Sequence, residues 1–293
     1  MIMRFDYRRP KNLSEALEIL ANEGEKARIL AGGTDLLVNI QEGVDDPELV
    51  VDIGELDELK GIQEESGIIE LGTLVTHAGV MASELLNEKA LVLVSACSEV
   101  GAPQIRARGT IGGNLAAASP AGDSIPALYV LGATIVLKNR EGEREVPIEN
   151  FFTGVKQSSL RPDELLTAVR FPAMNDAGRC FFKKLGQRKA LAITKVTVAA
   201  CLVIREGIIE NIRIALGAVA PTVIRASRAE SYLSGQPLTE EVIARAAQLV
   251  SEESRAINDI RSTEEYRNEM TGLLLTRGLV ETRERPEKPS ESE

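Results

Sequence analysis

The sequence has no tryptophan and few other aromatic residues, with 4 tyrosines and 6 phenylalanines among 293 residues. Proteins that bind single-stranded nucleic acids usually stack the bases on exposed aromatic side chains. The net charge of −10 also opposes binding to a phosphate backbone, which is attracted to basic surfaces. Both properties argue against a nucleic-acid partner.

Histidine occurs once, as His77, so no metal site can be built from several histidines. A Ser-His-Asp triad would depend on this one residue, which follows Thr76 at an expected helix start. We favour a helix-start role over an acid or base role. The three cysteines, Cys97, Cys180 and Cys201, contain no C-x-x-C pair. This spacing disfavours a disulfide framework, a zinc site and an iron–sulfur cluster, so buried thiols are expected.

Long apolar runs are also missing, because no stretch reaches the roughly 20 residues that span a bilayer. The first ten residues, MIMRFDYRRP, lack the apolar core of a secretory signal. We therefore expect no membrane span and a cytoplasmic location.

Two stretches rich in glycine and small residues stand out. Gln104 to Asp123 reads QIRARGTIGGNLAAASPAGD, and Ala31 to Asp35 reads AGGTD. Glycine permits positive φ and close approach to the backbone, and exposed N–H groups in such turns bind anions. Two such loops could hold one diphosphate, although each could also be a simple tight turn. Neither contains the G-x-G-x-x-G fingerprint or a P-loop, which disfavours a Rossmann nicotinamide site.

Periodicity and turn residues predict a helix that Asn12 and Glu15 begin as a capping box and Gly24 ends. Further helices are expected over 35–40, 76–86, 90–100, 124–131, 226–233, 238–250 and 263–280. Strands are expected over 27–30, 49–53, 61–62, 68–71, 73–75, 134–138, 146–148, 164–171, 180–185, 196–205 and 208–217. The segment 172–178 has the composition of a loop and is the best boundary candidate. The sequence pattern after this segment predicts a three-stranded antiparallel sheet covered by helices, which is an α+β arrangement.

The two glycine stretches carry a resemblance to a known family. Supporting residues are Ala31-Gly32-Gly33-Thr34-Asp35, Thr110-Ile111-Gly112-Gly113-Asn114, Arg9-Pro10, Phe151-Phe152-x-Gly154, Leu160-x-x-x-Glu164-Leu165-Leu166 and Lys184 through Val198. The chain resembles the FAD-binding subunit of the molybdenum hydroxylases, which include carbon monoxide dehydrogenase and xanthine dehydrogenase. The resemblance implies an α+β fold of the vanillyl-alcohol oxidase type over 1–175, with two small α+β subdomains. It also implies an α+β domain over 176–283, and 284–293 is expected to be a disordered tail.

The family pattern implies which residues bind FAD. The residues expected to hold its diphosphate through backbone N–H groups are Ile29, Leu30, Ala31, Gly32, Gly33, Thr34, Asp35, Leu36, Thr110, Ile111, Gly112, Gly113 and Asn114. Asp123 matches a carboxylate near the ribityl or ribose hydroxyls, and Lys184 a lysine near the pyrimidine edge of the flavin. Val100 matches a position near the adenine, and Leu166 one against the isoalloxazine. Asp123 could instead cap the helix at 124–131, Lys184 could be a surface lysine, and the other two could be core residues.

Two departures from the family pattern concern the flavin environment. Leu191 and Ala192 stand where relatives often have an acidic residue, and Ala117 replaces a hydroxyl residue that some relatives use on the cofactor. The first departure makes the surroundings of the flavin less negative. It leaves open which electron acceptor is used and how that acceptor reaches the flavin.

The resemblance implies an electron-transfer subunit within a hetero-oligomer. A molybdopterin-binding large subunit would oxidise the substrate, and a small subunit with 2Fe-2S clusters would pass electrons to FAD. The flavin would then reduce NAD or another acceptor. Because the flavin supplies the redox chemistry, no side chain here is expected to be catalytic and no metal is expected in this chain. The alternatives are a stand-alone FAD-dependent oxidase or dehydrogenase and a flavin-free assembly protein.

Overall fold

The computed structural model describes residues 5–174, 178–188 and 191–284. The chain divides into two compact units. The first unit contains residues 1–83, 102–119 and 132–173, and the second contains 84–101, 120–131 and 174–293. Most of the expected tail and the middle of the expected boundary segment lie outside the described residues, whereas Glu284 still belongs to a helix. The domain boundary at residue 175 therefore stays a prediction.

A small parallel sheet forms the beginning of the first unit. Its strands are β1 (Asp6–Arg8), β3 (Leu49–Asp52) and β2 (Ala27–Leu30), in that order. The helix α1 (Leu13–Glu23) buries Ala16, Leu17 and Leu20 in the same core cluster as residues of β3. The Asn12 half of the expected capping box is confirmed, because the Asn12 side chain accepts the Glu15 N–H at 2.9 Å. The Glu15 carboxylate in turn accepts the N–H of Lys11.

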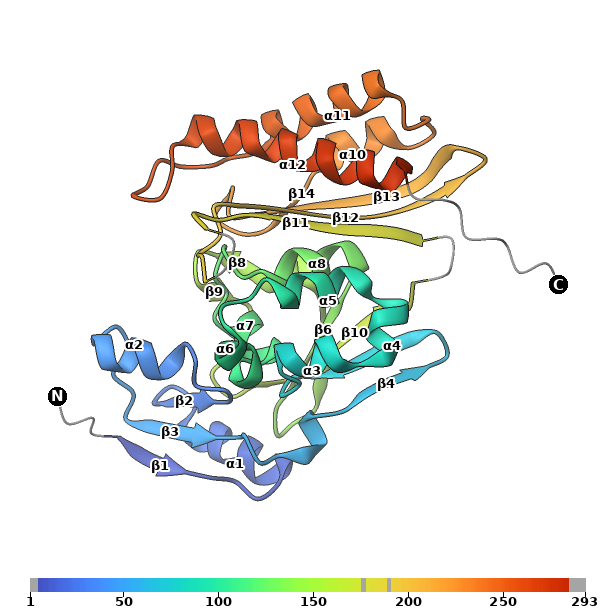
Figure 1. Cartoon of the computed structure of the whole chain (residues 1–293). Helices are drawn as coiled ribbons and strands as arrows, with labels where there is room; N and C mark the ends of the chain where they lie inside the picture. Colours follow the sequence, from blue (N-terminus) through green and yellow to red (C-terminus); the bar gives the residue numbers. More distant parts are fainter. Residues whose placement is uncertain (1–4, 175–177, 189–190, 285–293) are drawn as a thin grey trace. The chain divides into compact units, whose positions relative to one another are not determined.

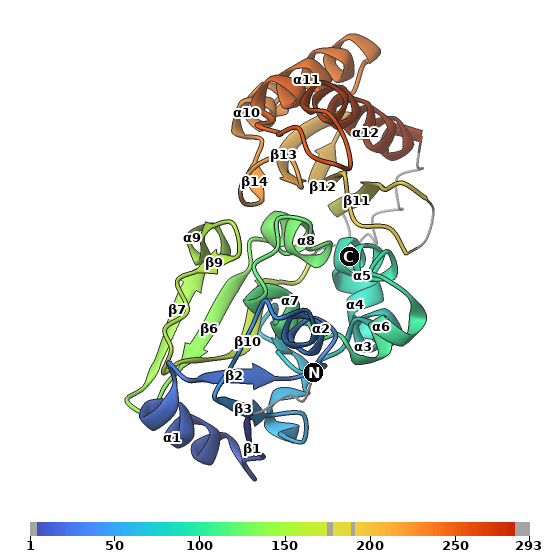
Figure 2. The same ribbon diagram turned by 90° about the vertical axis from the view of Figure 1, so that its left-hand side faces the viewer.

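The second sheet of this unit is antiparallel and has five strands. Its order is β4 (Ile62–Glu65), β5 (Ile68–Gly72), β10 (Leu165–Pro172), β6 (Thr134–Lys138) and β7 (Glu143–Pro147). Figure 2 shows β6 and β7 side by side, with β10 next to β6. The other elements of the unit are α2 (Leu36–Glu42), η1 (Asp57–Leu59), α3 (His77–Ala82), α6 (Pro103–Arg108), α7 (Ile111–Ala116), α9 (Ile148–Phe151), β8 (Phe152–Gly154) and β9 (Gln157–Ser158).

Three sequence predictions for these segments were wrong. Thr73–Val75 forms a turn rather than a strand. The helix expected over 76–86 ends at Ala82, because Ser83 is extended with a ψ of 118°. The stretch 104–123 is not one long loop, since it contains α6 and α7. Two adjacent glycines lie inside α7, where tertiary packing outweighs their poor helix propensity.

The second unit is built on an antiparallel sheet ordered β11 (Gly178–Leu185), β12 (Val196–Arg205), β13 (Ile208–Gly217) and β14 (Ile224–Arg225). The three expected strands are confirmed, and the two-residue β14 was missed. The helices of this unit are α4 (Glu84–Lys89), α5 (Leu91–Ser98), α8 (Ser124–Leu131), α10 (Ser227–Leu233), α11 (Glu240–Glu253) and α12 (Glu264–Glu284).

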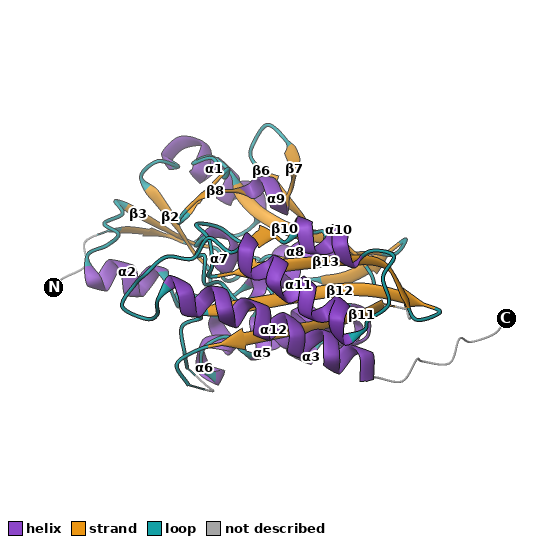
Figure 3. Cartoon of the chain, turned by 90° about the horizontal axis from the view of Figure 1, so that it is seen from above, coloured by secondary structure: helices purple, strands orange, loops and turns teal. Residues whose placement is uncertain are grey.

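The two faces of this sheet are covered by different helices. Figure 1 shows α11 and α12 on one face and α5 and α8 on the other, and Figure 3 shows α11 and α12 lying over the strands. Val196, Val198 and Ala200 alternate along β12 into one core cluster with residues of α10, α11 and α12. The intervening residues therefore face the side where α5 contacts β11 and α8 contacts β12. Every helix within the described ranges is too short or too polar to span a bilayer.

Candidate functional site

The first glycine loop, Ala31 to Asp35, connects β2 to α2 in the first unit. Gly33 has a φ of +75°, a conformation that is strained for other residues. Gly32 is required for a different reason, because a Cβ there would lie 1.9 Å from the carbonyl oxygen of Arg108. The loop therefore touches the end of α6 so closely that no side chain fits between them.

This loop presents a run of unused hydrogen-bond donors. Over the part of the chain that the structure describes, no acceptor bonds the backbone N–H groups of Gly32, Gly33, Thr34 and Asp35. The first three of these residues are half-buried and Asp35 is exposed. Successive backbone N–H groups of this kind form concave sites for anions. The first loop can therefore bind a phosphate group through its backbone.

The second glycine stretch is organised differently, because the N–H groups in the first turn of its helix α7 already have acceptors. The bonds run from Ile111 N to Val75 O (3.0 Å), Gly112 N to Thr73 O (2.9 Å), Gly113 N to Thr110 Oγ1 (3.0 Å) and Asn114 N to Thr110 O (3.0 Å). A Cβ on Gly112 would lie 2.4 Å from the Cβ of Thr73, so this glycine is needed for packing. For these four N–H groups, diphosphate binding would require the bonds to change. The N–H of Thr110 has no acceptor among the described residues.

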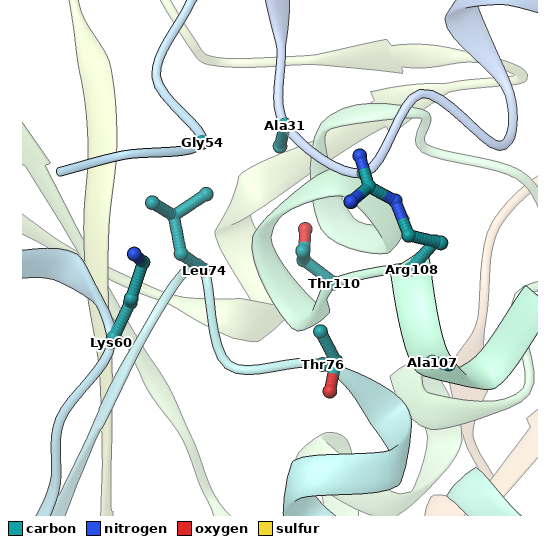
Figure 4. A pocket seen from close by; sticks show the side chains of 9 residues that line it. Ala31, Gly54, Lys60, Leu74, Thr76, Ala107, Arg108 and Thr110 are labelled. Atoms are coloured by element: carbon teal, nitrogen blue, oxygen red, sulfur yellow. The ribbon is translucent and has the colours of Figure 1, made fainter. Parts of the chain in front are cut away.

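A cavity of about 190 Å³ lies between these segments. It is lined by Ala31, Gly32, Gly54, Lys60, Leu74, Thr76, Ala107, Arg108 and Thr110. Figure 4 shows the side chains of Lys60 and Arg108 on opposite sides of it, with the Thr110 hydroxyl between them. Whole small ligands fill roughly 300–1,000 Å³, so this cavity fits one part of a dinucleotide. Two cations and no lining carboxylate suit an anionic part.

Sequence reasoning missed both cations of this cavity. Arg108 lies within the second glycine stretch, next to Gly109, and could have been considered, whereas nothing near Lys60 in the sequence marks it. The Lys60 ammonium also donates to Asp57 at 2.8 Å, and this hydrogen bond raises the pKa of Lys60. Lys60 is therefore a cation at neutral pH, as any arginine is.

The cavity wall at Gly54 is held by a buried carboxylate. Asp52 accepts the Gly54 N–H at 2.9 Å with one oxygen, and its other oxygen accepts from Tyr7 and from Arg9. Burial alone would raise the pKa of Asp52, but these hydrogen bonds outweigh burial and lower it. The Arg9-Pro10 motif thus supports the cavity indirectly, through Asp52.

In the second unit, Asp123 and Lys184 form a buried ion pair. Lys184 Nζ lies 2.6 Å from Asp123 Oδ2 and also donates to the carbonyl of Glu99 at 2.9 Å. The Thr194 hydroxyl donates to Asp123 Oδ1 at 2.6 Å. The two charged side chains are only 8 % and 6 % exposed, so Lys184 is not a surface lysine. Burial pushes the pKa of Asp123 upward, and Lys184 and Thr194 oppose it.

These bonds orient the Asp123 carboxylate, and each of its oxygens can still accept one more hydrogen bond. Each carboxylate oxygen has two lone-pair directions, and one is used at each oxygen by the bonds from Lys184 and Thr194. A ligand hydroxyl can therefore still donate to Asp123. Thr194 was not among the predicted site residues, and its hydroxyl carries no sequence signal of this role.

Two further candidate residues and the single histidine lie in or beside the protein core. Leu166 is 4 % exposed in β10, opposite Leu137 of β6, which makes it a core residue. Val100 is half-buried and follows α5. His77 begins α3 and is 2 % exposed; burial, with a smaller effect of Arg106, lowers its pKa to about 4. It is neutral at pH 7, as expected of a helix-start residue in a protein core. No three acidic, cysteine or histidine side chains of the described residues are placed to hold a metal.

Two family models match successive parts of the chain. Residues 3–174 match the model of the FAD binding domain in molybdopterin dehydrogenase, and residues 181–282 match that of the CO dehydrogenase flavoprotein C-terminal domain. The chain is 32% identical to the carbon monoxide dehydrogenase medium chain of Hydrogenophaga pseudoflava, covering 94% of this chain and 96% of that one. It is 31% identical to the xanthine dehydrogenase FAD-binding subunit of Escherichia coli O157:H7, covering 89% and 90%.

The solved structures agree with these sequence relatives. A structure of carbon monoxide dehydrogenase from Hydrogenophaga pseudoflava superposes with a TM-score of 0.93 at 31% identity, covering 97% of this chain and 99% of that one. The predicted fold and family are confirmed by this match and by the two family models. The chain therefore belongs to the FAD-binding medium subunits of the molybdenum hydroxylases.

Proposed function

We propose that this chain is the electron-transfer subunit of a molybdenum hydroxylase complex, receiving electrons from iron–sulfur clusters of a small subunit. A large subunit with molybdopterin would oxidise the substrate. The relatives that support this proposal are named as medium chains or FAD-binding subunits of dehydrogenases. Bound FAD supplies the redox chemistry, and the protein supplies position and electrostatics.

The run of unbonded N–H groups from Gly32 to Asp35 carries the proposal for the cofactor site. These donors would hold the FAD diphosphate, and Lys60 and Arg108 would offset its charge in a chain of net charge −10. The Thr110 N–H would add a donor from the second stretch. The other proposed contacts, those of Ile29, Leu30, Ala31, Leu36 and of residues 111–114, stay predictions.

Asp123 and Lys184 supply the proposed polar contacts of the second unit. Asp123 would accept hydrogen bonds from ribityl or ribose hydroxyls, because Lys184 and Thr194 hold it in one orientation. Lys184 would also place a buried positive charge near the flavin, which favours the reduced, anionic ring. The packing roles of Val100 and Leu166 against the adenine and the isoalloxazine remain part of the proposal.

A titration of the purified chain with FAD tests the site. Arg108→Met should weaken binding by at least about tenfold, since a charge-assisted contact contributes about 1.5–3 kcal/mol and 1.4 kcal/mol is tenfold. Arg140→Met, which removes an exposed arginine of the β6–β7 turn, is the matched control and should leave the affinity unchanged. Equal FAD affinity in the two variants would show that Arg108 does not contact the cofactor.

The alternatives give different results in the same preparation. A chain that folds but binds no FAD would support the assembly protein, and steady turnover of an organic substrate by the isolated chain would support a stand-alone oxidase. Co-purification with a molybdopterin-containing and an iron–sulfur subunit would support the complex. Absence of both partners from a native preparation would contradict it.

NAD is the proposed acceptor, with oxygen, a quinone or another carrier as alternatives. Leu191, in the stretch where the family pattern often has an acidic residue, is 53 % exposed and has a φ of +55°. The acceptor is identified by following which of these compounds reoxidises the reduced, FAD-loaded complex. The cytoplasmic location expected from the sequence stays a prediction.

A further inference from the structure

Cys180 and Cys201 lie directly opposite each other on the neighbouring antiparallel strands β11 and β12. Opposite residues of such strands have Cα atoms about 4.5 or 5.5 Å apart. Disulfides form between Cα atoms about 4.4–6.8 Å apart. The register of the two strands therefore gives these cysteines a backbone separation that a disulfide bond can close without a large movement.

The two side chains also point to the same side of the sheet. Phe181, which follows Cys180, belongs to the core cluster with α11 and α12, as do Ala200 and Leu202 on either side of Cys201. Because side chains alternate along a strand, both cysteines face the other side. There the Cys180 side chain lies close enough to Cys201 to raise the pKa of its thiol.

The surroundings of the pair differ for its two members. Cys180 is 7 % exposed, whereas Cys201 is half-buried and its sulfur lies 3.9 Å from the sulfur of Met174. Arg213 lies opposite Cys201 on the next strand, β13. A neighbouring cation favours a thiolate, so Cys201 is the better placed of the two to meet an oxidant first.

We propose that Cys180 and Cys201 are a redox-active pair that closes into a cross-strand disulfide when a hydroperoxide reaches Cys201. The Cys201 thiolate attacks hydrogen peroxide, the O–O bond breaks, and Cys201 becomes a sulfenic acid. The hydroxide that leaves takes up the proton released by the Cys201 thiol and becomes the first water. The Cys180 sulfur then attacks the sulfenic sulfur, forming the S–S bond and releasing a second water. Two thiols lose two electrons and two protons, and one hydrogen peroxide becomes two waters.

The structure sets the speed and the consequence of this step. The Cys180 side chain, together with burial, raises the pKa of the Cys201 thiol, and Arg213 offsets this only in part. Little thiolate is present at neutral pH, so the disulfide forms slowly, under sustained rather than brief exposure to peroxide. Once formed, it ties β11 to β12 on the face that also carries Lys184.

The experiment uses the full-length chain, fully reduced and then exposed to hydrogen peroxide. Remaining thiols are alkylated and counted by intact mass, and peptide mapping locates any link. The number of alkylated cysteines should fall from the 3 in the sequence to one, with Cys97 still alkylated and Cys180 linked to Cys201. The Tm should rise by several degrees, because the bond restricts the unfolded chain, and a reductant should reverse the rise.

Single substitutions separate this pair from general oxidation. Cys97→Ser should leave the link and the Tm rise intact, whereas Cys201→Ser and Cys180→Ser should each abolish both. Three alkylated cysteines after prolonged exposure would overturn the proposal. So would sulfinic acids without a link, a link that includes Cys97, or dimers joined through Cys201.

Discussion

Replacing Gly32 by alanine tests whether the first loop must touch α6 for FAD to bind. A Cβ at this position would lie 1.9 Å from the carbonyl oxygen of Arg108, whereas ordinary contacts begin at 3.4 Å. The neighbour is a backbone atom, so it cannot rotate away, and the loop and the end of α6 must separate by about 1.5 Å, the difference between these distances.

Two losses are expected from that separation. Forcing an extra methyl group into a packed contact costs about 1–3 kcal/mol of unfolding free energy. The N–H groups of the loop would also move relative to a bound phosphate by enough to break hydrogen bonds, which tolerate only about 0.5 Å of variation. Losing one or two charge-assisted bonds lowers FAD affinity roughly 10- to 100-fold.

The assay pairs a fluorescence titration with FAD and a urea unfolding curve for each variant. Gly142→Ala is the matched control in the same unit, because a Cβ there meets open space and its φ is not positive. We expect the control to bind FAD as the parent chain does, with equal or slightly higher stability. Affinity of Gly32→Ala within twofold of the parent would show that FAD binding does not depend on this close contact.

Three further predictions concern stability, each measured by urea unfolding. The pKa of His77 is lowered from 6.5 to about 4, so its neutral form stabilises the fold fully above pH 6.5 and this contribution is lost as the pH falls toward 4. His77→Gln should therefore reduce the difference in unfolding free energy between pH 7 and pH 5 by about 2 kcal/mol. An unchanged pH profile would contradict this. Lys184→Met leaves Asp123 buried without its cation and should lower the unfolding free energy by about 3–5 kcal/mol. Adding Asp123→Asn to the same chain should restore part of this loss. A loss below about 1 kcal/mol would show that the pair is solvated. Gly278→Ala would put a Cβ 2.2 Å from the ring of Phe181 and should cost about 1–3 kcal/mol, whereas a neutral effect would mean that α12 can shift away from β11.

Elements whose signals are local could be predicted from the sequence. The capping box at Asn12 and Glu15 locates the start of α1 because the contact spans three residues. The hairpin of β12 and β13 is predicted with its bounds, since Glu206 and Gly207 both adopt positive φ in a two-residue turn. In these cases the residues that decide the structure are neighbours in the chain.

Elements that depend on distant contacts could not be predicted in the same way. Gly112 and Gly113 are poor helix formers, yet they lie in α7 because Gly112 packs against Thr73, far away in the sequence. The short strand β14 exists because Ile224 and Arg225 pair with β13, and two residues carry no periodicity. For the same reason Lys60 was missed, since only the folded chain brings it to the cavity.

Most of the glycines discussed in the two stretches are needed because neighbouring atoms lie too close to allow a side chain. Gly33 is the one residue of the first loop with positive φ, whereas Gly32 and Gly112 have neighbours that leave no room for a Cβ. The Gly32 contact is with Arg108 itself, so it joins the loop that offers four N–H groups to the segment that offers a guanidinium. We therefore propose that the two stretches contribute to one anion site. Gly32→Ala should then weaken FAD binding more than Arg108→Met does, because it displaces both kinds of donor at once.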